Sequence, residues 1–452
     1  MRDPVTFQSA YLRHGTRLGA WLLTGSVFTD AMLWGVSAAK VLGVLGIFLL
    51  FVTTLVAPRL TTRELVFLGL TWAVVLLNLA FYPTAYPENL SSIVFSFAQG
   101  TCLILVLVMT ARLTFSCVLR YFAGWAVAAS LLGIVQALTG TLFLSDRVFF
   151  STVIPGTWRA SGFCNDPNYF ALLTLIALPI VWHQRRIAPH RWWTLGAAVL
   201  AASVVFSGSR AGILLLPVGP VLAGLMLKRR LASKAFYVAA VAAVCVPAVV
   251  ATFDRLPESV RAVFDSRSYD EASERISLRV RARAARAAVT AAREHPLFGY
   301  GIGNIVNHPD NPAHVLSHNN YLEVLADTGA PGLAMYLWLI VHCLNRLLRM
   351  TRAPHGGTAL LAKHVLTSFL AYLLMSASLV TYYSRMWFFL VGVVFVAMRI
   401  SDRTARVAAA VPRSPSQTLP ERSAQPPSWT RDRSRGLTTS ATAGCVMRRR
   451  SQ

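Results

Sequence analysis

Charged side chains are scarce in this chain of 452 residues, of which 14% are charged and 55% are hydrophobic. A soluble globular protein carries roughly 25% charged residues, so the composition excludes a chain that faces water along most of its length. Acidic residues are the scarcer kind, with 19 against 43 basic residues. The basic residues lie in short segments between apolar runs, in one long polar segment and in the C-terminal tail, a distribution that argues against nucleic acid as a partner.

Paired cysteines are missing as well. The six cysteines are scattered and none forms a C-x-x-C pair, so we expect neither a disulfide framework nor a cysteine-ligated metal. The basic N-terminal segment is followed by an apolar run without an A-x-A site, so the sequence gives no sign of a cleavable signal peptide.

Long apolar runs dominate what is present. A helix needs about 20 apolar residues to cross a bilayer, and we count about twelve such runs. The first is weak because it contains Asp30. The predicted fold is therefore an all-α, polytopic bundle of about twelve transmembrane helices over residues 1–399. The runs are centred near residues 27, 47, 74, 101, 128, 176, 200, 219, 244, 340, 372 and 392.

Arginine and lysine in the short connections predict the orientation. They gather on one side of the predicted spans, and an even number of spans then places both termini in the cytoplasm. The loops 140–168 and 254–330 face outward. Loop 254–330 is rich in arginine, but long translocated loops are exempt from the charge rule. Within it, Glu274–Arg293 has no glycine or proline and predicts a helix. Residues 400–452, rich in Pro, Ser and Arg, predict a disordered basic cytoplasmic tail.

Four polar motifs lie in the predicted outward segments. They read R-x-x-G-x-x-x-x-P-N at Arg159–Asn168, S-x-S-R-x-G at Ser207–Gly212, H-P-L-x-G-x-G-x-G-N at His295–Asn304 and H-N-x-Y-L-E-x-L-x-x-x-G at His318–Gly329. In this order, over about residues 155–345, the chain resembles the O-antigen ligase/polymerase family of bacterial membrane glycosyltransferases. The resemblance implies an inner-membrane enzyme. Its donor would be a glycan on undecaprenyl diphosphate, transferred with inversion to an acceptor hydroxyl at the periplasmic face.

Two arginines at the outer ends of predicted spans, Arg159 and Arg210, are the candidates for holding the diphosphate, because guanidinium groups bind phosphate oxygens in bidentate fashion. Ordinary snorkelling of a span-end arginine is the alternative. The family usually carries a further arginine at the start of the loop helix, for which we choose Arg279, with Arg281 competing. The chain has no D-x-D sequence, so we expect a metal-free site without a cofactor.

His318 is the candidate acid or base, because a neutral imidazole near pH 7 can accept the proton of an acceptor hydroxyl. Hydrogen bonding to the donor sugar or phosphate, or capping of the next helix, would also explain it. His295, His308 and His314 are nearby alternatives. The amides of Asn168, Asn319 and Asn320 are candidates for binding the glycan or the acceptor, although capping of helix ends would explain them equally.

The acceptor stays open at this stage. A ligase would use a glycolipid, a polymerase a second lipid-linked glycan, and protein-glycosylating ligases are a third variant. A lipid-linked oligosaccharide flippase is the rival from another class. Transporters usually carry charges at mid-membrane, whereas the polar groups here gather in the outer loops, which favours an enzyme. A structural partner in a polysaccharide assembly complex is a further alternative. The arginine-rich loop helix is also a candidate for contact with anionic membrane lipids.

Overall fold

Helices make up most of the chain in the computed structural model, so the predicted all-α class is confirmed. Within the part of the chain that the structure describes, two short antiparallel strands accompany the helices, β1 (Met32–Leu33) and β2 (Val36–Ser37). The structure describes residues 4–28, 32–33, 36–54, 62–81, 87–110, 115–141, 157–217, 271–353 and 356–410.

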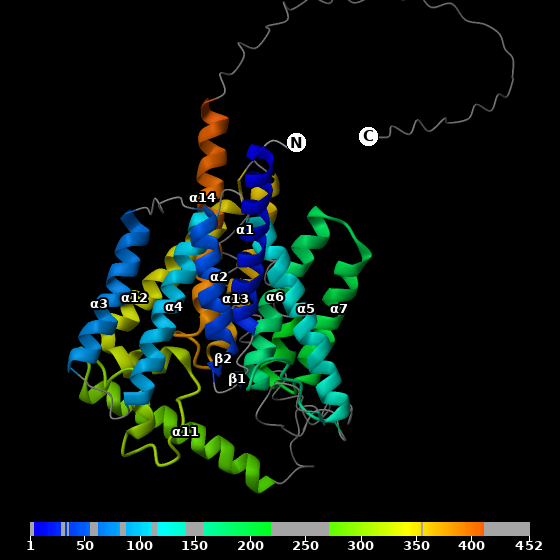
Figure 1. The fold of residues 1–452 in the computed structure, drawn as a ribbon. Coiled ribbons are helices and arrows are strands. Elements are labelled where there is room, and N and C mark those ends of the chain that lie inside the picture. The colour runs from blue at the N-terminus through cyan, green and yellow to red at the C-terminus, as the bar shows by residue number, and fades with distance from the viewer. Residues whose placement is uncertain are drawn as a thin grey trace, which may run out of the picture. The chain divides into compact units, whose positions relative to one another are not determined.

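Five helices precede the first polar motif and are blue to cyan in Figure 1: α1 (Pro4–Phe28), α2 (Ala38–Thr54), α3 (Thr62–Phe81), α4 (Pro87–Thr110) and α5 (Phe115–Thr139). Those that follow it are α6 (Pro167–Ile187), α7 (Arg191–Phe206), a helix that begins at residue 210, α11 (Glu271–Glu294), the 3-10 turn η3 (Asn304–Asn307), α12 (Asn320–Met350), α13 (Gly356–Met375) and α14 (Arg385–Ala410).

Three helices among the described residues are long and apolar enough to cross a membrane: Phe115–Thr139, Asn320–Met350 and Gly357–Met375. The predicted count of about twelve spans and the predicted orientation therefore stay predictions. The predicted centres near residues 219 and 244 lie outside the described residues. Those near 47, 74, 101, 128, 176, 200, 340, 372 and 392 each fall within a helix.

The position of the first predicted span is wrong. We placed its centre near residue 27, but α1 ends at Phe28 and the β1–β2 pair follows. A hydropathy window merges the apolar end of α1 with the apolar residues of the hairpin, although Asp30 and Gly35 are typical of a break between them. The first half of α1 contains Arg13, which lowered its mean hydropathy and hid it from the same window.

The helix predicted over Glu274–Arg293 is confirmed as α11. It packs on α12 and η3, and Figure 1 shows it lying across one end of the bundle. Small side chains make this contact: Ala287, Ala288 and Ala291 are buried in a cluster with Ile305 and Ala326. We call these three residues the alanine face of α11. The opposite face carries exposed arginines, so the helix is amphipathic even though its apolar side is made mainly of alanine.

The helix α14 runs on to Ala410, past the predicted start of the tail at residue 400. The chain divides into two units at this helix, Met1–Arg406 and Val407–Gln452. Thr404–Arg406 continue the helix, because this stretch contains neither glycine nor proline. Residues 411–452, and with them the predicted disordered tail, lie outside the described residues.

Candidate functional site

The first two polar motifs meet at Arg159. Its neighbours fix the backbone on both sides, since the Trp158 N–H donates to the carbonyl of Ala137 and the Ala160 N–H to that of Phe206, each at 2.9 Å. The guanidinium then donates through Nε to the carbonyl oxygen of Ser207 at 2.8 Å and through Nη2 to Oδ1 of Asn168 at 3.1 Å. A loop side chain is thereby tied to the ends of both α6 and α7.

The turn at Ser207–Ser209 is shaped to receive this arginine. Gly208 has a φ of +62°, and a Cβ atom there would lie 3.2 Å from Nε of Arg159. Ser209 accepts the N–H of Gly212 at 3.3 Å and so caps the helix that begins at residue 210. The S-x-S-R-x-G motif therefore provides a carbonyl for Arg159 and starts a new helix with Arg210 as its first residue.

The start of α6 holds the third member of this group. Asp166 is the N-cap residue, and its Oδ1 accepts the N–H of Asn168 at 2.6 Å and that of Tyr169 at 3.3 Å. Because Asp166 supplies the cap, the side chain of Asn168 is available to accept from Arg159. Asn168 thus contacts a candidate phosphate-binding arginine, and the structure shows it holding that side chain in place.

Three charged groups act on Arg159, one from its own motif and two from other segments of the chain. Burial lowers the pKa of this guanidinium, the carboxylate of Asp166 acts in the opposite direction, and the positive charges of Arg281 and Arg210 lower the pKa further. An arginine remains charged under such a shift. Because the fields of Arg210 and Arg281 reach Arg159, three positive charges gather here beside a single carboxylate, which is an environment suited to a polyanion.

His318 lies in the same electrostatic environment. Burial lowers the pKa of its imidazole below 6.5, and the positive charge of Arg281 lowers it further, whereas Asp166 raises it. The imidazole is therefore neutral at pH 7. Its backbone has a φ of +54°, a left-handed conformation that costs a non-glycine residue on the order of 1–3 kcal/mol. Arg281 and Asp166 thus act on both Arg159 and His318, which links the first and the last of the four polar motifs.

Among the described side chains of α11, Arg281 is the arginine whose charge acts on both Arg159 and His318. The backbone of Arg279 is helical, but its side chain lies outside the described residues. Sequence reasoning left these two in competition and chose Arg279. Asp166 was missed altogether, although it lies inside the first motif; its position just before Pro167, at the start of a predicted span, was the available signal.

A sequence profile of the O-antigen ligase family matches residues 195–337, about a third of the chain, and covers the last three polar motifs. These residues are similar to the O-antigen ligase family. No curated protein matches the chain. The match supports a glycosyltransferase of the ligase or polymerase type, and the three long apolar helices among the described residues agree with a membrane protein. Arg159 and Asp166 lie before the matched segment.

Two asparagines at the start of α12 in the O-antigen ligase domain have structural contacts. Asn319 is the N-cap, and its Oδ1 accepts the N–H groups of Tyr321 and Leu322. Asn320 is fully buried: its Nδ2 donates to the hydroxyl of Tyr336 at 2.7 Å, and its Oδ1 accepts the N–H groups of Thr381 and Tyr382, each at 2.7 Å. Helix capping thus accounts for Oδ1 of Asn319 and bundle contacts for the amide of Asn320, and binding of a glycan by either residue stays a prediction.

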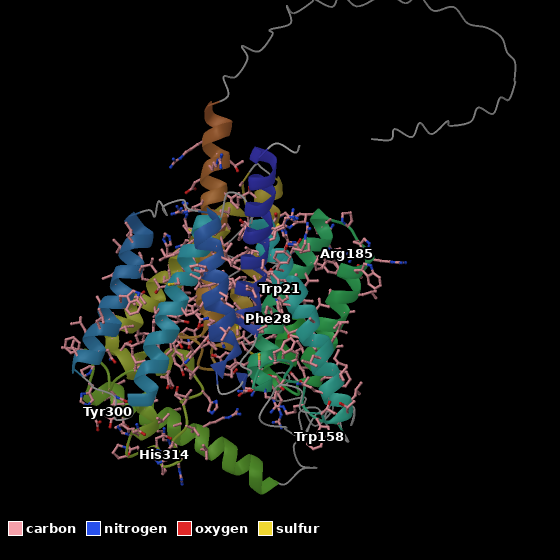
Figure 2. All side chains as sticks on the ribbon, viewed as in Figure 1. Trp21, Phe28, Trp158, Arg185, Tyr300 and His314 are labelled. Carbon is pink, nitrogen blue, oxygen red and sulfur yellow. The ribbon has the colours of Figure 1, made fainter. Side chains whose placement is uncertain are left out.

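The other histidines of the O-antigen ligase domain have partners of their own. His308 is buried and lies 3.4 Å from Glu294, and Nδ1 of His314 lies 2.7 Å from the carbonyl of Val306. His295 packs beside the ring of Tyr300. Figure 2 places Tyr300 and His314 at the same end of the bundle as Trp158. Within the described ranges, no three His, Cys, Asp or Glu side chains come together as a metal site would require.

The glycine-rich motif docks on α12 through backbone contact. Gly299 and Gly329 both have positive φ, and a Cβ on either would lie within 2.6 Å of backbone atoms of the other segment.

Asp327 accepts the N–H of Gly303 and the hydroxyl of Tyr382. Asn78 of α3 donates to the carbonyls of Phe298 and Asp327 and accepts the N–H of Ile302. Close approach at the two glycines and these hydrogen bonds together join the glycine-rich turn to α3 and α12.

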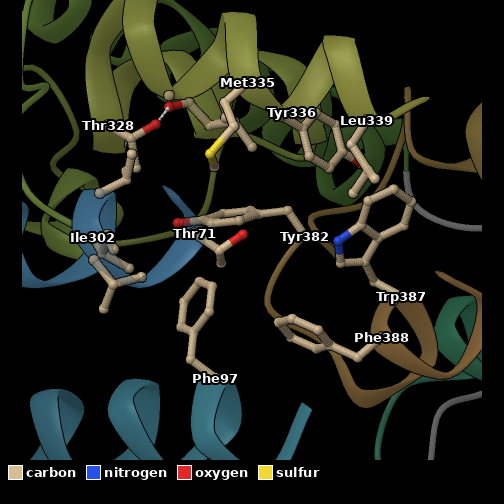
Figure 3. A pocket seen from close by; sticks show the side chains of 14 residues that line it. Thr71, Phe97, Ile302, Thr328, Met335, Tyr336, Leu339, Tyr382, Trp387 and Phe388 are labelled. Atoms are coloured by element: carbon tan, nitrogen blue, oxygen red, sulfur yellow. Dashed lines mark hydrogen bonds between the residues drawn. The ribbon is translucent and has the colours of Figure 1, made fainter. Parts of the chain in front are cut away.

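An apolar cavity of about 40 Å³ lies beside this network, between α3, α4, α12 and the start of α14 (Figure 3). Phe97, Tyr336, Trp387 and Phe388 provide aromatic walls, and Tyr382 separates it from Asp327. A space of this size takes a few water-sized groups. It therefore offers no room for a sugar.

Proposed function

We propose that this protein transfers a glycan from an undecaprenyl-diphosphate carrier to an acceptor hydroxyl at the periplasmic face of the inner membrane. The transfer is inverting and needs no metal. One observation carries the proposal: Arg159 and His318, more than 150 residues apart in the sequence, share the charges of Arg281 and Asp166. An anion site and a neutral imidazole that share the same neighbouring charges suit the departure of a diphosphate and the deprotonation of a hydroxyl.

The diphosphate lies against Arg159, Arg210 and Arg281 in this proposal. The bonds of Arg159 to Ser207 and Asn168 use two of its N–H groups. A guanidinium has five such donors, so the others are available for phosphate oxygens. Fixed donors stabilise a developing negative charge without reorganising during the reaction. Arg281 joins them from α11, Arg279 stays a candidate because its side chain lies outside the described residues, and Asn168 acts by holding Arg159.

His318 acts as the general base. Its neutral imidazole accepts the proton of the acceptor hydroxyl as the hydroxyl oxygen forms a bond to the anomeric carbon. The bond between that carbon and the diphosphate oxygen breaks, and the diphosphate leaves with the electron pair. The new bond forms on the face opposite the leaving group, so the configuration inverts. The low pKa of His318 keeps the base form populated at pH 7.

Purified protein with a synthetic polyprenyl-diphosphate glycan donor, an acceptor and a chelator tests the proposal. We expect the unmodified protein to transfer the glycan in the presence of the chelator. The transfer rate should fall by about 100-fold or more in Arg210→Ala and in His318→Ala. Arg283→Ala is the matched control, because Arg283 is exposed on α11 and none of the site's contacts involves it. Normal transfer by both site variants would remove the site assignment, and transfer that depends on an added divalent metal would remove the metal-free mechanism.

The acceptor distinguishes a ligase from a polymerase. A ligase joins the finished glycan to a glycolipid, whereas a polymerase joins it to another lipid-linked repeat. Deletion of the gene separates the two. Long unlinked chains accumulate when a ligase is lost, and single repeats accumulate when a polymerase is lost.

A further inference from the structure

Glu323 lies in the first turn of α12, five residues after His318, and the reaction proposed above gives it no part. We propose that Glu323 is a positioning residue, which fixes the conformation of His318 by holding the backbone of the preceding residue. This inference rests on the proposed function, in which His318 is the general base.

A closed set of hydrogen bonds surrounds His318. The N–H of Ser317 donates to Oε2 of Glu323 at 2.8 Å. The hydroxyl of Ser317 donates to the carbonyl of Asn319 at 3.0 Å and accepts the N–H of Asn319 at 3.3 Å. Asn319 in turn caps α12. The residues on both sides of His318 are therefore hydrogen-bonded to the first turn of α12. Glu323 makes this bond to Ser317, the residue before His318.

The backbone conformation of His318 has to be held by its neighbours. Its left-handed φ of +54° is a conformation that a non-glycine residue keeps only when its surroundings determine it. Without the bond from Glu323, Ser317 is released on one side, and the segment can relax toward a more common backbone conformation. The imidazole would then move relative to the arginines.

The burial of Glu323 argues that it is not there for stability. The side chain is fully buried, Oε2 accepts the Ser317 N–H, and Oε1 has no hydrogen-bond partner. A buried carboxyl group with an unsatisfied oxygen is costly, and an apolar residue of similar volume often stabilises such a position. The carboxyl group is therefore best explained by what it holds, which is the segment that carries the base.

Three variants separate this role from a structural one. Glu323→Gln keeps an oxygen that accepts the Ser317 N–H, whereas Glu323→Leu fills the space but accepts nothing. We expect Glu323→Leu to stay folded, because the buried leucine offsets part of the cost of the unpaired Ser317 N–H, and to lose about 100-fold in kcat. Its KM for the donor should stay within about threefold, because the arginines remain in place. Glu323→Gln should keep kcat within about threefold. Glu323→Asp, too short to reach Ser317, serves in place of Glu323→Leu if that variant does not fold.

A double variant distinguishes failure of this inference from failure of the proposed function. If Glu323 acts through His318, Glu323→Leu adds no further loss to His318→Ala. A full-sized additional loss would overturn the positioning role and leave the base assignment intact. Full activity of His318→Ala would instead overturn the base assignment. Unchanged kcat in Glu323→Leu, or equal damage by Glu323→Gln, would also contradict the positioning role.

Discussion

At the scale of single residues, the proposed base depends on charges that come from other parts of the chain. Arg281 of α11 lowers the pKa of His318, so removing that positive charge raises it. Activity that needs the neutral imidazole is lost as the pH falls through this pKa. We therefore expect Arg281→Gln to move the acid limb of the kcat profile to higher pH, whatever it does to the maximal rate. Arg283→Gln, exposed on the same helix, should leave the limb in place.

Asp166 provides the opposite test. Its carboxylate raises the pKa of His318, so Asp166→Asn should lower that pKa and move the acid limb of kcat to lower pH. Asparagine caps a helix about as well as aspartate, so the cap on α6 and the folded state should survive. The measurement is the same pH profile together with the unfolding temperature. A limb that stays fixed in both variants would show that His318 is not the titrating group.

The candidate residues differ in how far the sequence could predict them. Arg159, Arg210 and His318 each lie in a polar motif that the sequence shows directly. In the structure, Arg281 and Asp166 act on both Arg159 and His318, and Arg210 acts on Arg159. Arg281 could not be separated from Arg279, because both lie on the same helix and only its packing decides the rotation. Asp166 looks like an ordinary N-cap in the sequence, and its effect on two distant side chains depends on tertiary contact.

At the scale of elements, the backbones of the glycine-rich turn and of α12 approach each other closely at Gly329. A Cβ on Gly329 would lie 2.6 Å from the backbone of Leu297, and φ is +71°. We expect Gly329→Ala to destabilise the protein by about 2–4 kcal/mol and to lower its unfolding temperature. Gly124→Ala is the matched control, since nothing lies within 4 Å of a Cβ there and alanine favours a helix. Equal unfolding temperatures for the two variants would contradict this fit.

Helices were the most predictable elements, because their apolar runs and the glycine-free stretch of α11 are long enough to read from the sequence alone. The break after Phe28 was missed, since the hairpin that follows is as apolar as the helix before it. The change of direction in α12 at Gly329 was also hidden: the residue is glycine in a helical pattern, and its positive φ results from contact with Leu297.

At the scale of the whole molecule, Asn78 connects the part of the chain before the family match to the family's glycine-rich turn. It is buried, and its amide satisfies the carbonyls of Phe298 and Asp327 and the N–H of Ile302. Asn78→Ala leaves these buried groups without partners, at about 1–3 kcal/mol each. We expect a lower unfolding temperature and reduced transfer. Leu77→Ala, at an exposed neighbouring position of α3, should change neither, and equal effects would contradict the connection.

The alanine face of α11 has a consequence for how this protein can diverge. Successive residues of a helix are turned by about 100°, so the fit of Ala287, Ala288 and Ala291 against α12 sets the direction in which Arg281 leaves the helix. Arg283 and Arg286 face away from that fit. Related proteins can therefore vary the outward side of α11 to suit different ligands, while the direction of Arg281, whose charge lowers the pKa of His318, stays unchanged.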